Sequence, residues 1–149
     1  MSSKAPPPSP AYVLGHSDAE IRRLEIQARR IDPVTRRIFT AAGVGAGMRV
    51  LDVGSGAGDV ALLLTDLVGT DGEVVGFDRS ASALDIARQK VAAGLFTNVM
   101  FVAGDADDVR FDEQFDAVVG RYVLQFQADP SAVLARVASF ALDATCTDL

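Results

Sequence analysis

The fold is decided by one stretch of the chain, Val50-Leu51-Asp52-Val53-Gly54-Ser55-Gly56-Ala57-Gly58-Asp59. An apolar run that carries one acid is followed by three glycines at alternate positions, and an apolar-periodic segment begins at Val60. This pattern predicts a strand, a tight loop and a helix. Because glycine has no Cβ, a ligand can lie against the main-chain N–H groups at the start of the helix. The stretch therefore predicts a binding site for a nucleotide-like ligand.

The spacing of the glycines and two nearby acids indicate the kind of ligand. The dinucleotide fingerprint G-x-G-x-x-G would need glycine at position 59, where this chain has Asp59. Asp52, just ahead of the loop, would repel a pyrophosphate but attract an ammonium or sulfonium group. The charge pattern therefore favours S-adenosylmethionine over NAD, and an NAD-dependent oxidoreductase is the weaker alternative.

Several stretches of the chain resemble one known family. Residues 50–59 resemble the first motif of the class I S-adenosylmethionine-dependent methyltransferases, and later stretches agree in order and spacing from about Tyr12 to Phe140. Within that family the chain is similar to the small-molecule branch that includes the ubiquinone and menaquinone biosynthesis methyltransferases. The resemblance implies an α/β, Rossmann-like fold with a parallel sheet and helices on both faces. It also implies S-adenosyl-L-methionine as cofactor and methyl transfer to a small-molecule acceptor, but it assigns no catalytic residue.

The resemblance also implies which residues contact the cofactor. Asp78, which lies 20 residues beyond Gly58, matches the acid that accepts hydrogen bonds from both ribose hydroxyls. Asp105 matches the acid that accepts from the adenine amino group, and the backbone at Gly120 would contact the methionine part. Arg79 either covers the adenine ring or lies in solvent. The predicted cofactor-binding residues are Asp52, Gly54, Ser55, Gly56, Gly58, Asp78, Arg79, Gly104, Asp105, Ala106, Gly120 and Arg121.

Hydrophobic periodicity predicts alternating helices and strands along the rest of the chain. Strands are expected at residues 48–53, 73–77, 98–102 and 115–119, and helices begin at Ser17, at Asp32-Pro33, near Ala83 and at Asp129-Pro130; the second ends near Ala42-Gly43 and the third at Gly94. In open α/β sheets the ligand lies at the carboxyl ends of the strands where the strand order switches. Arg121 or Tyr122, after the fourth strand, could therefore face the acceptor, or they only close the sheet.

The sequence predicts three parts of the chain. Residues 1–11 carry four prolines and predict a disordered tail, residues 12–45 predict a helical lid, and residues 46–149 predict a cofactor-binding domain with the first four strands. In the family that this chain resembles, such a lid folds over the cofactor and the acceptor. Helices that simply cover the sheet would explain the same pattern. The candidate lid residues are Tyr12, His16 and Gln27.

Beyond Phe140 the resemblance stops. Family members usually continue with a Pro-Gly-Gly turn and further strands, whereas this sequence reads Ala141-Leu142-Asp143-Ala144-Thr145-Cys146-Thr147-Asp148-Leu149. The sheet is therefore predicted to be incomplete, with its fourth strand as an exposed edge that favours a homodimer or limits solubility. The short end also leaves an alternative function open. That alternative is a non-catalytic or truncated module that binds S-adenosylmethionine or S-adenosylhomocysteine and acts through a partner.

Composition narrows the class of protein. A chain of 149 residues with 49% hydrophobic and 23% charged residues is expected to form one globular, core-containing domain. The net charge of −6 argues against a surface that wraps nucleic acid. The single cysteine, Cys146, cannot form an internal disulfide, which fits a cytoplasmic location. No stretch is long and apolar enough to span a membrane, and the acids at residues 105–113 lack the order of a calcium loop, so no metal site is expected.

Overall fold

The computed structural model describes residues 32–142 and 146–148. The predicted tail, the helix that begins at Ser17 and the lid candidates Tyr12, His16 and Gln27 lie outside the described residues and stay predictions. A helical segment at residues 32–41 comes first. The elements that follow are β1 (Arg49–Val53), α2 (Asp59–Val68), β2 (Glu73–Asp78), α3 (Ala81–Gly94), β3 (Val99–Ala103), β4 (Ala117–Gly120), the 3₁₀ helix η1 (Leu124–Phe126), α4 (Pro130–Ala138) and β5 (Cys146–Asp148).

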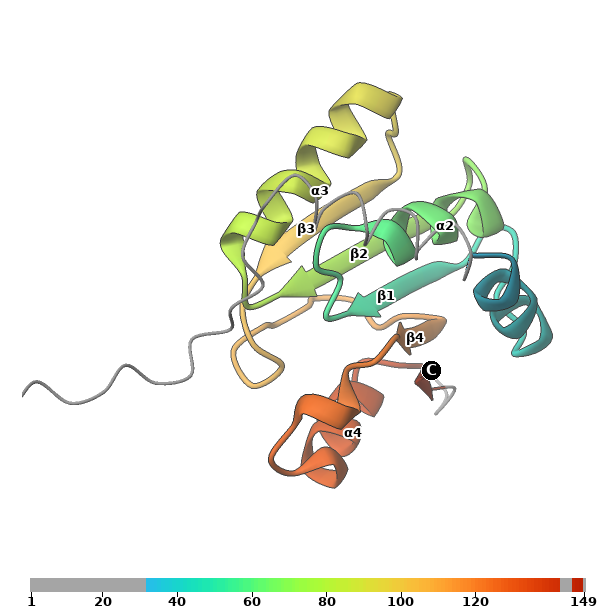
Figure 1. Ribbon diagram of the computed structural model, residues 1–149. Coiled ribbons are helices and arrows are strands. Elements are labelled where there is room, and N and C mark those ends of the chain that lie inside the picture. Colours follow the sequence, from blue (N-terminus) through green and yellow to red (C-terminus); the bar gives the residue numbers. More distant parts are fainter. Residues whose placement is uncertain (1–31, 143–145, 149) are drawn as a thin grey trace, which may run out of the picture. The chain divides into compact units, whose positions relative to one another are not determined.

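The strands form one parallel sheet in the order β3-β2-β1-β4-β5 (Figure 1). The chain builds outward from β1 through β2 to β3, and then returns to the other side of β1 with β4. Val53 at the end of β1 is level with Phe77 of β2 and with Gly120 of β4. The carboxyl ends of these three strands therefore meet at the point where the strand order switches, which is where open α/β sheets bind ligands.

Each face of the sheet packs against its own helices. Val50 and Val74 point into a buried cluster with side chains of α2, α3 and Phe39 from the helical segment at residues 32–41. Leu51 and Val75, the next residues along, point into a second cluster with side chains around α4. Alternate residues of a strand face opposite sides, so these strands are apolar almost throughout. Helices on both faces of a parallel sheet (Figure 1) confirm the predicted Rossmann-like fold.

The prediction that the fourth strand is an exposed edge of the sheet is wrong. β5 pairs in parallel with β4, where Val118 is level with Cys146 and Gly120 with Asp148. A further isolated bridge joins Phe115 to Ala141. Because both sides of β4 are paired, the outer strands of the described sheet are β3 and β5. The premise for a homodimer through the fourth strand is therefore gone.

The start of α4 agrees with the sequence prediction, and α3 begins at Ala81, close to the predicted start near Ala83. Asp129 caps α4, because its carboxylate accepts a hydrogen bond from the backbone N–H of Ala132 at 3.0 Å, and Pro130 is the first helical residue. The helical segment at residues 32–41 ends next to Ala42-Gly43, where the sequence predicts its end. The end of α3 differs slightly, since Leu95, and not glycine, takes the left-handed conformation after the helix (φ 55°). Among the described helices, none is long and apolar enough to cross a membrane.

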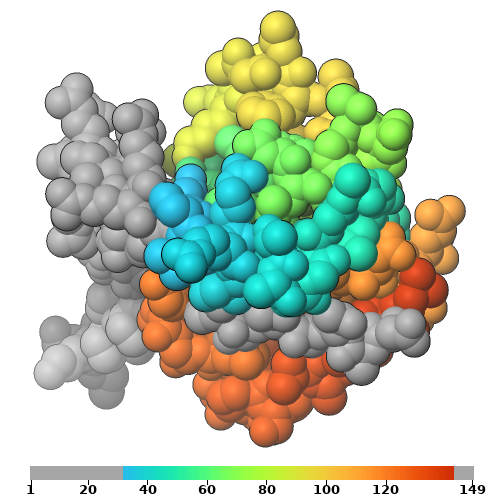
Figure 2. Space-filling model, turned by 90° about the vertical axis from the view of Figure 1, so that its right-hand side faces the viewer, coloured from blue at the N-terminus to red at the C-terminus, as the bar shows by residue number. Residues whose placement is uncertain are grey.

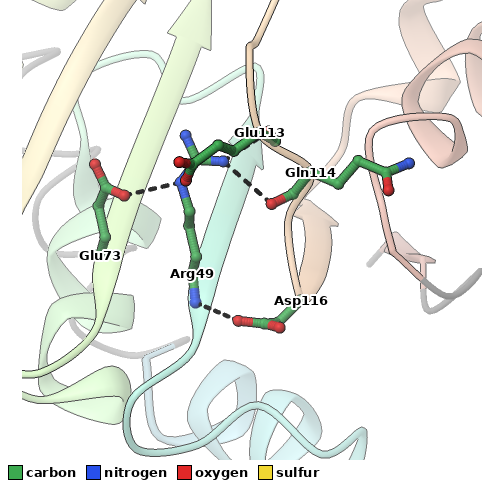
Figure 3. Close-up of polar contacts among 5 residues, drawn as sticks. All are labelled: Arg49, Glu73, Glu113, Gln114 and Asp116. Atoms are coloured by element: carbon green, nitrogen blue, oxygen red, sulfur yellow. Dashed lines mark hydrogen bonds and ion pairs between the residues drawn. The ribbon is translucent and has the colours of Figure 1, made fainter.

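Arg49 fixes the amino end of the sheet (Figure 3). Its Nε donates to the Glu73 carboxylate at 2.8 Å, and its Nη1 donates to the carbonyl oxygens of Glu113 at 2.7 Å and Gln114 at 3.2 Å. Its backbone N–H donates to the carboxylate of Asp116 at 2.8 Å. One side chain and its amide thus join β1 to β2 and to the segment that leads into β4.

Candidate cofactor-binding site

The loop between β1 and α2 uses its glycines for different purposes. Gly54, Gly56 and Gly58 all have positive φ angles, which glycine adopts without strain. A Cβ at position 58 would come within 2.9 Å of the Cβ of Ala87 in α3, so the helices can pack closely only around glycine. A Cβ at position 56 would meet nothing within 4 Å. Gly58 is therefore required by packing, whereas Gly56 borders open space in which a ligand could lie.

Asp78, at the end of β2, holds this loop in place. One carboxylate oxygen accepts a hydrogen bond from the backbone N–H of Gly56 at 2.9 Å, and the other accepts from that of Ser80 at 2.8 Å. The carboxylate thus ties the loop to the start of α3, where the Ser80 hydroxyl caps the helix by accepting from Ala83 N–H. Each oxygen of an ionised carboxylate has a second lone pair. Asp78 can therefore anchor the loop and still accept from the hydroxyl groups of a ligand.

The residues predicted to contact adenine lie together, but they also bond one another. The guanidinium of Arg79 lies 3.8 Å from one carboxylate oxygen of Asp105. The other oxygen accepts a hydrogen bond from the backbone N–H of Ala106 at 2.8 Å. The N–H of Ala106 is therefore already engaged within the chain. A ligand that used it would have to replace a hydrogen bond that already exists.

Asp52 is the buried acid of the site. It lies near the end of β1 with 1% of its surface exposed. Burial raises its pKa to about 8, and the guanidinium of Arg121 opposes this rise. The carboxylates of Asp78 and Asp59 raise the pKa further, while the backbone N–H of Ala61 lowers it. The carboxyl group of Asp52 is therefore mostly protonated at pH 7.

Four buried polar atoms have no hydrogen-bond partner in the part of the chain that the structure describes. Buried polar groups are almost always paired, so such atoms indicate a place where water or a ligand binds. They come from the helical segment at residues 32–41, from β1, from the glycine loop and from the residue after β4. These atoms are Asp32 Oδ1, Asp52 Oδ2, Ser55 Oγ and Arg121 Nη1.

Two further acids, Asp32 and Asp59, are not among the residues that the sequence predicts for the site. Asp32 stands at the predicted start of a helix; burial raises its pKa, and the charge of Arg121 opposes this rise. Asp59 forms an ion pair with Lys90 of α3 at 2.9 Å. Neither interaction has a local sequence signal, because the fold brings together residues that are distant in the chain. Elsewhere in residues 32–142, the predicted acidic segment at 105–113 forms no group of three side chains suited to a metal ion.

The donors and acceptors fit a ligand that carries both charges and a ribose. Asp52 and Arg121 each supply a buried atom that is not hydrogen-bonded, the Ser55 hydroxyl can donate or accept, and Asp78 can accept from a diol. Open space at Gly56 leaves room beside the loop. These are the groups that S-adenosylmethionine requires, with its ammonium, carboxylate, sulfonium and ribose.

Comparisons with known sequences give the same family. The family model described as "Methyltransferase domain" matches residues 45–142. The ubiquinone/menaquinone biosynthesis C-methyltransferase UbiE of Marinomonas sp. (strain MWYL1) is 36% identical over 102 residues, which are 67% of this chain and 41% of that protein. The demethylmenaquinone methyltransferase of Staphylococcus aureus (strain MRSA252) is 40% identical over 84 residues, or 56% of this chain and 34% of that protein. The chain thus matches about two fifths or less of the length of these relatives.

Solved structures share the fold. A SAM-dependent methyltransferase from Aquifex aeolicus superposes with a TM-score of 0.72 at 24% identity, over 84% of this chain and 67% of that chain. The magnesium protoporphyrin IX methyltransferase ChlM from Synechocystis PCC 6803, with bound SAM, gives 0.65 at 22% identity, over 85% and 60% of the two chains. At these identities the likeness concerns the fold alone. Because the family model matches well over half of its residues, the chain belongs to the class I S-adenosylmethionine-dependent methyltransferase family.

Proposed function

We propose that this chain binds S-adenosylmethionine at the carboxyl ends of β1, β2 and β4 and transfers its methyl group to a small-molecule acceptor. The observation that carries the proposal is the juxtaposition, at the switch point of the sheet, of an open glycine loop with buried polar atoms that have no partner. Asp78 anchors the loop at Gly56, while Asp52 and Arg121 lie beside it. A structural turn between a strand and a helix needs none of these charged groups.

Each part of the ligand has residues that would hold it. Asp78 would accept from the ribose hydroxyls, and the loop residues Gly54, Ser55, Gly56 and Gly58 would line the ligand with backbone. Asp52, Gly120 and Arg121 would hold the charged methionine end, and Arg79, Gly104, Asp105 and Ala106 would border the adenine. When bound, the cofactor supplies an electrophilic methyl group on a positively charged sulfur.

The contribution of the chain to the reaction is orientation. The glycine loop is held by Asp78, and Asp78 is held by the start of α3, so the loop backbone is fixed before a ligand arrives. Alignment of two reactants can lower a barrier by ~7–11 kcal/mol. Methyl transfer from sulfur to a good nucleophile needs such alignment more than acid–base groups, so no catalytic base is assigned.

We infer the class of acceptor and the location of the protein from its charge, its relatives and its cysteine content. The net charge of −6 favours a small molecule over a nucleic acid. The names of the two relatives make reduced demethylmenaquinone the first acceptor to test. The single Cys146 cannot form an internal disulfide, and we infer from it a cytoplasmic location.

Calorimetric titration tests the cofactor assignment directly. The full chain would be titrated with S-adenosylhomocysteine, which cannot react, and with NADH as a control of a different class. Binding of S-adenosylhomocysteine alone is the expected result. Binding of NADH alone would contradict the proposal. Transfer of label from methyl-labelled S-adenosylmethionine to the reduced quinone then separates an enzyme from a module that only binds.

A further inference from the structure

We propose that Asp52 makes the site selective for a positively charged ligand by giving up its proton when that ligand binds. The inference rests on the proposed function, because S-adenosylmethionine carries one more positive charge than its product S-adenosylhomocysteine. Selectivity of this kind would retain the substrate and release the product. It would act through a residue of the chain's own core.

The position of Asp52 places its charge where solvent cannot screen it. The residue lies on the sheet face that is covered by α2, between the apolar Leu51 and Val53, and is almost completely buried. Its Oδ2 atom has no partner in the described residues. An unpaired buried carboxylate is unfavourable, so the carboxyl group is stable there either as the neutral acid or with a cation beside it.

The charged groups around Asp52 allow both the neutral acid and the ionised carboxylate. These groups are Arg121, which directly follows β4, Asp78 of β2, and Asp59 of α2 together with the backbone N–H of Ala61. Asp59 is already paired with Lys90, and Asp78 already accepts two backbone N–H groups.

Arg121 is the main cation in this set, and it is shared. Its charge also lowers the pKa of Asp32 in the helical segment at residues 32–41, and no carboxylate among the described residues lies within ion-pair distance of it. Acids therefore outnumber unpaired bases at this point. An arriving cation supplies the counter-charge that ionised Asp52 lacks.

The protonation state of Asp52 then depends on the ligand. The pKa of about 8 keeps the carboxyl group mostly neutral at pH 7. A cation nearby favours the ionised form and lowers this pKa, and the released proton passes to the buffer. A ligand with an uncharged thioether gives less of this effect. Affinity for the cation should consequently increase as the pH rises toward 8, by up to about tenfold per pH unit.

The experiment is isothermal titration of the full chain with three probes that share the adenosine and the amino-acid end. S-adenosylmethionine and sinefungin carry an extra positive charge at or near the sulfur position, and S-adenosylhomocysteine does not. Titration in two buffers of different ionisation enthalpy at pH 6.5 gives the number of protons released. We expect a release that approaches one proton for the two cationic probes and a clearly smaller release for S-adenosylhomocysteine.

The pH series gives a second readout. Between pH 5.5 and 7 the α-ammonium group of the probes stays charged, so a change in affinity reports the protein. The ratio of the S-adenosylmethionine affinity to the S-adenosylhomocysteine affinity should rise up to about tenfold per pH unit in this range. In Asp52→Asn the ratio should be constant with pH and the extra proton release should disappear. Asp66→Asn makes the same substitution at an exposed residue of α2 and should behave as wild type.

The possible outcomes separate the two proposals. Equal proton release for all three probes in the wild-type chain, or a pH-dependent ratio that persists in Asp52→Asn, would overturn the role of Asp52 and leave the proposed function intact. If none of the three probes binds, the proposed function fails, and this inference fails with it. The wild-type titrations decide the matter even where a variant does not fold.

Discussion

Polar side chains are hydrogen-bonded at one end of the parallel sheet and have unpaired buried atoms at the other. At the amino end, the guanidinium of Arg49 is bonded to one carboxylate and two carbonyl oxygens and lies 4.0 Å from the ring centre of Phe115. At the carboxyl end, the guanidinium of Arg121 has a buried Nη1 atom without a partner, and Asp52 has a buried oxygen in the same condition. Both ends belong to the same strands, β1 and β4.

This difference separates polar groups that stabilise the fold from polar groups that are available to a ligand. A hydrogen bond inside the protein adds about 0.5–1.5 kcal/mol to stability, and an unsatisfied buried group costs about 1–3 kcal/mol. The amino end, which we call the paired end, therefore stabilises the fold. The carboxyl end, which we call the unpaired end, lowers stability, and a ligand that bonds its unpaired atoms would remove this cost. In the surface view the helical segment at residues 32–41, which carries Asp32 of the unpaired end, forms part of the exterior (Figure 2).

The largest expected effect is on the pH dependence of stability, and it comes from the unpaired end. The pKa of Asp52 is about 8 in the folded chain and near 3.8 when unfolded, so the folded state holds the proton more tightly. Stability is therefore lost as the pH rises from about 4 to 8, on the order of 5–6 kcal/mol for this one group. Asp52→Asn should remove that loss. Its free energy of unfolding should match wild type near pH 4 and exceed it at pH 8, as measured by urea denaturation.

The same denaturation series on Asp66→Asn provides the control, because Asp66 is exposed and its ion pair with Arg36 lies on the surface. A difference between Asp52→Asn and wild type that does not grow with pH would show that Asp52 is ionised in the folded chain.

A pair of glycine variants should divide stability from binding within the loop. Gly58→Val introduces a side chain against Ala87 at a left-handed φ of 87°, and it should cost about 2–4 kcal/mol of stability from strain and overcrowding. Gly56→Val points into open space, so it should cost less stability but prevent binding of S-adenosylhomocysteine. Thermal denaturation and calorimetric titration of both variants test this. Tight binding by Gly56→Val would place the ligand elsewhere.

Asp78→Ala should weaken the binding of S-adenosylhomocysteine. It removes the acceptor for the Gly56 backbone N–H and the proposed acceptor for the ribose hydroxyls, so S-adenosylhomocysteine affinity should fall by about 1.5–3 kcal/mol, more than tenfold. Asp85→Ala, an exposed acid of α3 paired with Arg88, is the matched control and should bind as wild type. Unchanged affinity of Asp78→Ala in the same titration would remove Asp78 from the site.

Arg49→Met should affect the paired end alone. Loss of the bonds to Glu73 and to the two carbonyl oxygens should cost about 1–2 kcal/mol of stability, a modest value because the ion pair is partly exposed. Ligand affinity at a temperature where the variant is folded should not change. A large loss of affinity would mean that the two ends of the sheet are coupled, and the comparison between them would no longer hold.

Much of the fold could be predicted because its signals are local. The glycines at 54, 56 and 58 predict a strand, a loop and a helix, and α4 begins at the Asp129-Pro130 pair as expected. The fifth strand could not be predicted, because Cys146–Asp148 is only three residues long and is defined solely by its pairing with β4. Phe115 was assigned to a strand by its apolar neighbours, but it forms only an isolated bridge before β4 begins.

The site was predictable only as a set of residues, and its internal bonds were not. Sequence motifs indicated Asp52, Asp78 and Asp105, but not that Asp105 would bond the next backbone N–H or that Asp78 would hold Gly56. The raised pKa of Asp52 is a consequence of burial by distant segments. The interaction of Asp32 with Arg121 likewise requires the whole domain to fold, since no periodicity links residues that far apart.

The place of β1 in the sheet has a consequence for how the site responds to partial unfolding. Every register position of β1 from Val50 to Val53 is matched by β2 on one side and by β4 on the other. Its amide hydrogens bond either β2 or β4, and each of these strands is itself paired on its other side in the described sheet, so β1 should belong to the last unit to open to exchange with heavy water. The glycine loop follows directly after the end of β1. Fraying of the outer strands β3 and β5 would therefore leave the loop in shape, so that ligand recognition should survive until the domain unfolds as a whole.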